Sequence, residues 1–391
     1  MGEHPRDAGF FRDADIDLAA FAALTGQQLD PADVLFAASV EKNIPLYDME
    51  ALAATLAGPG RAALLSEWAW VLGASAGVIV LKRAYADTGP VDRATKVFNA
   101  IIADERAGSA GQGDHFAASG QNDRVWNALQ KHCLRDPEGF ALYLGNAPIA
   151  AACEAWLGPN YQVTAQVNQV RPGGKAQSAH RDYHLGFMSA AQAARYPRHA
   201  HEVTASLTLQ GGIAHVDMPV ESGPTKLLPF SQLYGPGYLA FHQDAFRAHF
   251  EAHYVQLALE KGDAIFFNPA LFHAAGENKS ADIARMVNLL QVSSAFGRAM
   301  EQIDRAAMAE ALLPVLIQLK QAGRLDAAQV AAAIAASAEG YAFPTNLDTD
   351  PPVGGLAPRS MADLLTEAVA AGTGQVDFAA TLSALAGRQS A

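Results

Sequence analysis

Residues 161–294 constrain the fold most strongly, because short apolar runs of strand length alternate there with turn residues. These runs are rich in β-branched and aromatic residues, and Gly, Pro, Asn and Asp separate them: YQVTAQVNQV (161–170), VTASLTLQGG (203–212), YVQLALE (254–260), DAIFFN (263–268) and MVNLLQVS (286–293). Several short strands joined by such turns are typical of an antiparallel sandwich or barrel. We therefore expect the centre of the chain to form a β structure.

Both flanks of this region show helical patterns instead. Residues 15–72 are rich in Ala and Leu with tight-turn signals, and a β-branched run at 77–81 reads as a strand that leads into a helix. Beyond Phe296, apolar residues recur at spacings of three and four, and a last helical stretch is expected at 361–371. The predicted fold class is α+β, with a mainly β core and helical additions at both ends. The predicted regions are an N-terminal helical region at 1–76, the core at 77–297 and a C-terminal helical extension at 298–391.

Composition excludes several classes of protein. Half of the 391 residues are hydrophobic, so the chain can bury a large core without disulfides. Its formal net charge of −12 argues against a nucleic-acid partner. Only two cysteines occur, which favours a reducing, cytoplasmic location. The charged N-terminal segment does not resemble a secretory signal, and the longest uncharged apolar stretch, 68–81, is too short to span a bilayer. We expect no membrane association.

Chemistry-bearing residues concentrate in the β region. His180-Arg-Asp182 lies in one segment, and His273 follows 93 residues later. Residues i and i+2 of a strand project to the same face, so His180 and Asp182 can address one ion together. Two imidazoles and one carboxylate leave other positions of an octahedral ion open, which suits non-haem Fe(II). By itself the pattern is weak, because a chain with twelve histidines produces such pairs by chance.

A second segment, His215-Val-Asp217, has the same spacing and competes for the same role. The neighbourhood of His273 favours the first pair, because Arg285 begins an otherwise apolar strand twelve residues further on. Burying an unpaired guanidinium is expensive, so Arg285 needs a partner. A bidentate carboxylate is the natural one.

In sequence order these segments resemble the phytanoyl-CoA dioxygenase (PhyH) family of Fe(II)/2-oxoglutarate-dependent oxygenases. The resemblance spans roughly 77–294 and rests on the following residues: His180-Arg-Asp182, the stretch ESGPTKLLPFS at 221–231, Lys261-Gly-Asp263, His273, Asn278-Lys-Ser280 and Arg285. The chain departs from the family's "GPL…IPGSH" stretch at Phe230, where glycine is usual, and at Gln232, which replaces histidine. That departure concerns the geometry of a loop outside the metal site.

The resemblance implies a double-stranded β-helix, that is, a jelly-roll or cupin-like fold. It implies that His180, Asp182 and His273 are the catalytic metal ligands and that Arg285 holds the distal carboxylate of 2-oxoglutarate. The implied cofactors are Fe(II), 2-oxoglutarate as cosubstrate and O2. His215 and Asp217 then fall where the family has no ligand. Gln177 is a further candidate contact, either of the cosubstrate or of a metal ligand, and Asn168 and Ser280 are weaker candidates of the same kind.

The implied reaction is hydroxylation, because Asp182 is present where related halogenases have Ala or Gly. His184 lies on the ligand face if the strand continues, although an ordinary loop histidine fits equally well. The glycine-rich segment 107–121 is a candidate cover for the site.

The substrate is expected to be a small molecule, and local charge points to an anion. The segment 161–201 carries five basic residues against one acid, in a chain that is acidic as a whole: Arg171, Lys175, Arg181, Arg195 and Arg198 against Asp182. The alternative, that these side chains form salt bridges with acidic neighbours, stays open.

Two other functions remain open at this point. One is a cupin-like metal-dependent isomerase or hydrolase that does not use 2-oxoglutarate, and the other is a non-catalytic binding protein on the same fold. The terminal helices either support the sheet, form a homodimer interface or make a separate binding domain.

Overall fold

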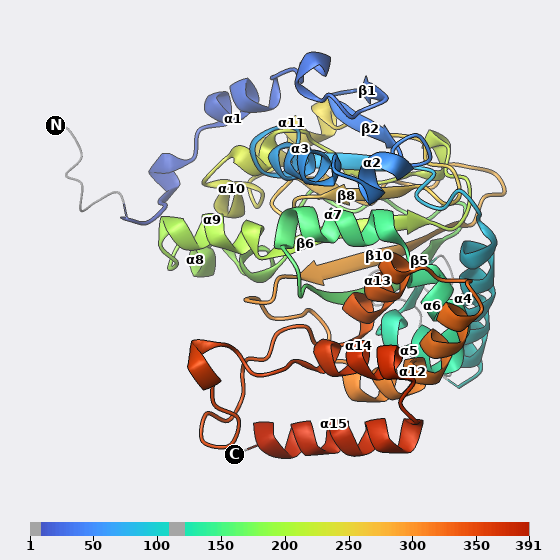
Figure 1. The fold of residues 1–391 in the computed structure, drawn as a ribbon. Helices are drawn as coiled ribbons and strands as arrows, with labels where there is room; N and C mark the ends of the chain where they lie inside the picture. The colour runs from blue at the N-terminus through green and yellow to red at the C-terminus, as the bar shows by residue number, and fades with distance from the viewer. Residues whose placement is uncertain (1–8, 109–121, 391) are drawn as a thin grey trace. The chain divides into compact units, whose positions relative to one another are not determined.

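The computed structural model describes residues 9–108 and 122–390, which form a mixed α+β structure (Figure 1). The chain divides into two compact units. The first comprises Met1–Ala86, Gly111–Arg124 and Asn168–Leu289, and the second comprises Asp87–Ala110, Val125–Val167 and Leu290–Ala391. The region boundaries expected at residues 76 and 297 stay a prediction.

The main β element is an eight-stranded sheet with the order β1-β2-β3-β8-β6-β10-β5-β4. Its strands are β1 (Ser39–Glu41), β2 (Ile44–Asp48), β3 (Val78–Lys82), β4 (Asn122–Val125), β5 (Gln162–Val170), β6 (Thr208–Ala214), β8 (Ala264–Phe267) and β10 (Arg285–Ser293). β8 lies between β3 and β6 and pairs antiparallel with both. The runs predicted at 161–170, 263–268 and 286–293 therefore form β5, β8 and β10.

A small second sheet carries the other strands of the β core. β7 (Lys226–Leu227) pairs antiparallel with β9 (His273–Ala274). Single-residue bridges extend this sheet on both sides, from His273 to His180 and from Leu227 to Val255. Along the chain, β5, β6, β8 and β10 of the large sheet interleave with the segments of the small sheet. Two sheets connected in this way form a double-stranded β-helix, so the predicted fold is confirmed.

An apolar core unites side chains of the two sheets in the first unit. Buried residues of the large sheet, including Val80, Ile265 and Phe267, belong to one cluster with Leu227 of the small sheet. β6 and β8 approach closely, because a Cβ at Gly211 would lie 2.5 Å from the ring of Phe266. This packing fixes the strands that bear the polar residues of the site.

Two predicted strands differ from the structure. Residues 203–206 end a helix, α9 (Arg198–Ser206), and the strand begins only at Thr208. The helix buries His201 and Thr204, which are three residues apart and therefore share one of its faces. The run at 254–260 contributes isolated bridges at Val255 and Leu259 and no continuous strand.

The N-terminal region holds more than the expected helices. It contains α1 (Leu18–Thr25), α2 (Ala53–Ala57) and α3 (Arg61–Ala74), but also β1 and β2. β2 pairs parallel with β3 and so extends the large sheet. The remaining helices of the first unit are α8 (Ala190–Ala193), α10 (Gly237–Ala240) and α11 (Asp244–His253).

The second unit is mainly helical. Its helices are α4 (Gly89–Gly108), α5 (Ala128–Arg135), α6 (Pro137–Leu144), α7 (Ala147–Leu157), α12 (Arg305–Gln321), α13 (Ala327–Ser337), α14 (Met361–Ala371) and α15 (Gln375–Gln389). Capping boxes at Asp326 and Ser360 begin α13 and α14. α15 was not expected from the sequence. In the described part of the chain no helix is long and apolar enough to cross a membrane.

Candidate metal centre

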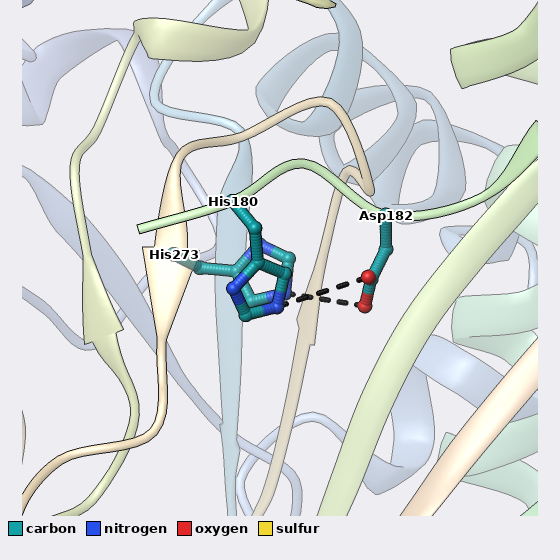
Figure 2. Close-up of side chains that lie close together, drawn as sticks. All are labelled: His180, Asp182 and His273. Carbon is teal, nitrogen blue, oxygen red and sulfur yellow. Dashed lines mark ion pairs between the residues drawn. The ribbon is translucent and has the colours of Figure 1, made fainter. Parts of the chain in front are cut away.

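Backbone pairing brings the first His-x-Asp segment against β9. The amide of His180 donates to the carbonyl of His273 at 3.0 Å, and the amide of His273 donates back to His180 at 3.1 Å. Two residues further on, the amide of Asp182 donates to the carbonyl of Pro269 at 3.0 Å. Segments 93 residues apart thus present their side chains to one point (Figure 2).

The three side chains meet closely. Nε2 of His180 lies 3.7 Å from Oδ1 of Asp182, and Nε2 of His273 lies 3.4 Å from Oδ2. The two imidazole centroids are 4.4 Å apart. All three candidate donor atoms fall within 4.8 Å of one another, and no second such group of His, Cys, Asp and Glu occurs among residues 9–108 and 122–390.

Backbone carbonyls fix which nitrogen of each imidazole faces the cluster. Nδ1 of His180 lies 2.9 Å from the carbonyl oxygen of Ser178, and Nδ1 of His273 lies 2.9 Å from that of Leu271. A carbonyl oxygen only accepts hydrogen bonds, so each Nδ1 carries the hydrogen. In the neutral form of each imidazole the lone pair of Nε2 then faces the cluster, the arrangement found in histidines that bind metals.

The protonation states also suit a cation. Burial lowers the pKa of His180, and the neighbouring His273 lowers it further. Burial raises the pKa of Asp182, but contacts with His273 and His180 outweigh this effect and lower the pKa to about 2. Asp182 is therefore ionised at neutral pH, and a bound cation would compensate its charge. Two nitrogens and one carboxylate oxygen form a donor set that fits Fe(II).

Arg285 begins β10 and is only 5% exposed. Its Nη1 donates to the carbonyl oxygens of Ser222 at 3.2 Å and Gly276 at 3.3 Å. Burial lowers the pKa of Arg285 to about 10, so the guanidinium keeps its charge at neutral pH. Within the described residues no carboxylate pairs with it. The sequence led us to expect a carboxylate partner for Arg285, and no described side chain provides one. A carboxylate from a bound small molecule would suit this guanidinium.

The other predicted contacts occupy different settings. Gln177 is exposed, and its Oε1 accepts from the amide of Ala275 at 3.2 Å, which ties the His180 segment to the segment that follows His273. The hydroxyl of Ser280 donates to Oδ1 of Asn278 at 2.6 Å within a local turn. Oδ1 of Asn168 is buried and, among the described residues, lacks a hydrogen-bond partner.

The second His-x-Asp segment lies outside the cluster. His215 is buried and its amide donates to the carbonyl of Met286 at 3.0 Å, whereas Asp217 is exposed and accepts from the amide of Lys261 at 2.9 Å. His184 is half-buried, with Nδ1 2.7 Å from the hydroxyl of Thr204.

Most of the basic residues near the site have partners within the chain. Arg171 pairs with Asp123, Lys175 with Glu277 at 3.1 Å, and Arg198 with Asp15 at 3.2 Å. Arg181 is buried and donates to the carbonyls of Ser231 and Tyr234. The local positive charge therefore gives no support to an anionic substrate. Of the expected cover at 107–121, residues 109–121 lie outside the described residues.

Sequence reasoning missed Gln210. It lies in β6, is buried, and donates a hydrogen bond from Nε2 to Oδ2 of Asp182. The available signal was the one amide side chain in the strand run 208–214, next to Gly211 and Gly212.

A double-stranded β-helix with two imidazoles and one carboxylate gathered at its small sheet defines a class of metal-dependent enzymes. The chain belongs to the phytanoyl-CoA dioxygenase family, because residues 47–287 match Phytanoyl-CoA dioxygenase (PhyH). The resemblance seen in the sequence is confirmed. Fe(II) and 2-oxoglutarate, the cofactors predicted from it, are likewise confirmed by this membership together with the His-Asp-His cluster.

Among curated proteins, the chain is similar to Dioxygenase trt7 from Aspergillus terreus, with 27% identity over 139 residues. The match covers 36% of this chain and 43% of that protein, so it spans less than half of the relative.

Two solved structures with lower similarity come from nogalamycin biosynthesis. The non-heme α-ketoglutarate-dependent epimerase SnoN is 20% identical, with 60% of this chain and 84% of SnoN covered at a TM-score of 0.41. The non-heme α-ketoglutarate-dependent carbocyclase SnoK is also 20% identical. The match covers 66% of this chain and 90% of SnoK, at a TM-score of 0.44. Similarities of this size carry no activity from those enzymes to this chain.

Proposed function

We propose that this protein is an Fe(II)/2-oxoglutarate-dependent dioxygenase that hydroxylates a C–H bond of a small substrate. The observation that carries the proposal is the convergence of His180, Asp182 and His273, with donor atoms within 4.8 Å of one another. Bound Fe(II) and 2-oxoglutarate supply oxidation by O2, in which 2-oxoglutarate becomes succinate and CO2 and one oxygen atom enters the substrate.

The protein residues have separate tasks in this proposal. Nε2 of each histidine and one oxygen of Asp182 hold the metal, while the carbonyls of Ser178 and Leu271 keep the imidazoles in the required tautomer. These three protein donors would hold the ion and leave room for the cosubstrate and O2 to bind it.

Arg285 anchors the distal carboxylate of 2-oxoglutarate. This role is supported by the burial and charge of the Arg285 guanidinium, which donates hydrogen bonds to two backbone carbonyls. A carboxylate there compensates a charge that is otherwise costly to bury. Gln177, Asn168 and Ser280 remain proposed cosubstrate contacts; the unsatisfied Oδ1 of Asn168 needs a donor from water or substrate, because 2-oxoglutarate offers none when ionised.

An apolar ring close to one ligand would help to keep water from the site. The ring of Phe267 packs on that of His273, with centroids 4.8 Å apart. A dry site protects a reactive oxidant from side reactions and strengthens the electrostatic contacts of the bound groups.

Turnover under isotopically labelled O2 tests the proposal. The purified protein is given Fe(II), 2-oxoglutarate and a panel of small metabolites, and we expect labelled oxygen in both succinate and the product. Formation of succinate together with an oxidised product that carries no label would exclude hydroxylation. It would still support the use of Fe(II) and 2-oxoglutarate. Conversion of a substrate without consumption of 2-oxoglutarate would instead favour the cupin-like isomerase or hydrolase.

A further inference from the structure

We propose that Gln210 is a positioning residue that orients Asp182 for metal binding, an inference that rests on the proposed metal site. Gln210 lies in β6, where its Cα is paired with that of Phe267 in β8. The ring of Phe267 in turn packs on His273. The register of the large sheet thus places this amide beside the cluster formed on the small sheet.

The two oxygens of Asp182 have different surroundings. Oδ2 accepts a hydrogen bond from Nε2 of Gln210 and lies 3.4 Å from Nε2 of His273. Oδ1 lies 3.7 Å from Nε2 of His180. Because Gln210 engages Oδ2, it restricts rotation of the carboxylate and so holds both oxygens in place beside the imidazoles. Hydrogen bonds of this kind commonly set ligand orientation and metal affinity.

The amide of Gln210 has only one workable orientation. An ionised carboxylate only accepts hydrogen bonds, so the NH2 group must face Asp182 and Oε1 must face away. In that orientation Oε1 is buried and finds no hydrogen-bond partner among the described residues. An unsatisfied buried carbonyl lowers stability, and an apolar side chain of similar size avoids that loss. The hydrogen bond from Nε2 to Asp182 is thus the one polar contact of this side-chain amide among the described residues.

Substitution Gln210→Met tests this role, because it keeps the length of the side chain and removes the N–H donor. The matched control is Gln232→Met. Gln232 also donates from Nε2, to the carbonyl of Ser75 at 2.7 Å, and also has a buried Oε1 without a partner among the described residues, but its amide bonds to no member of the cluster.

Two measurements on metal-free protein separate positioning from structure. Titration with Co(II), followed by the absorption of the bound ion, should show a dissociation constant about 10 to 100-fold weaker for Gln210→Met than for wild type. Gln232→Met should bind Co(II) as wild type does. Thermal unfolding of metal-free Gln210→Met should occur near the wild-type temperature, because loss of the hydrogen bond to Asp182 is offset by removal of the unsatisfied Oε1.

Co(II) affinity within twofold of wild type would overturn the proposal. The proposal would also be overturned if metal-free Gln210→Met were so much less stable than wild type that unfolding explained its weaker Co(II) binding. Gln210 would then have a structural role. If wild type binds Co(II) in a manner abolished by His180→Ala but does not consume 2-oxoglutarate, the proposed reaction fails while the role of Gln210 stands. If wild type does not bind Co(II), both fail.

Discussion

The two His-x-Asp segments share their spacing but differ in what the fold does with them. His180 exchanges two backbone hydrogen bonds with His273, so a third ligand from a distant segment arrives beside it. His215 follows the end of β6, and its Asp217 turns to the surface to accept from Lys261. A spacing of two residues thus makes a metal site only where pairing with another segment supplies the remaining ligand.

The matched substitutions Asp182→Asn and Asp217→Asn test this difference most strongly. Asp182→Asn removes the ionised ligand, and losing one partner of a buried charged group costs about 3–5 kcal/mol, or more than about 100-fold in binding. We expect Fe(II)-dependent succinate formation to fall at least that far, as measured by chromatography. Asp217→Asn should retain wild-type activity, and equal losses in both variants would erase the distinction.

Arg285 sharpens the comparison, because it follows His273, the ligand that pairs with the first segment, by twelve residues. Arg285→Met removes charge-assisted hydrogen bonds worth about 1.5–3 kcal/mol, so KM for 2-oxoglutarate should rise by about 10 to 100-fold. Arg305→Met is the matched control, since Arg305 is also buried and donates to the carbonyls of Ser337 and Val163. It should lower stability without changing KM, and an unchanged KM in Arg285→Met would refute the anchor.

A buried histidine outside both segments shows how a structural imidazole behaves. His132 is 1% exposed among Phe98, Phe140 and Tyr143, and burial lowers its pKa to about 4. The unfolded chain binds this proton near pH 6.5, so stability is full above that pH and falls as the pH drops toward 4. Between pH 6.5 and 4 the free energy of unfolding, measured in urea, should fall by about 1–3 kcal/mol less in His132→Phe than in wild type. The same pH dependence in both proteins would contradict the assignment.

The smallest effect concerns the stability contribution of the second segment. Asp217→Ala removes one exposed hydrogen bond to the amide of Lys261 and should lower the free energy of unfolding by about 0.5–1.5 kcal/mol. Urea unfolding of the metal-free protein measures it. A much larger loss, or a change in Fe(II) affinity, would mean that the second segment does more than support a turn.

Local patterns predicted much of the fold and of the cluster. β5, β8 and β10 have apolar residues in short strand-like patterns, and His180 and Asp182 stand two residues apart. β1 was missed because it has only 3 residues, and β2 was missed because it contains Pro45. Partners that are distant in sequence leave no local signal, so the contact of Gln210 with Asp182 required the structure. Salt bridges of Arg171 and Lys175 were an open alternative, but their partners Asp123 and Glu277 could not be named from the sequence for the same reason.

Anaerobic titration with Fe(II) in the presence of 2-oxoglutarate, followed by calorimetry, tests the central claim most directly. The account predicts one Fe(II) bound per wild-type chain and binding at least about 100-fold weaker in Asp182→Asn, with wild-type binding in Asp217→Asn. Fe(II) binding that is unchanged in Asp182→Asn would contradict it.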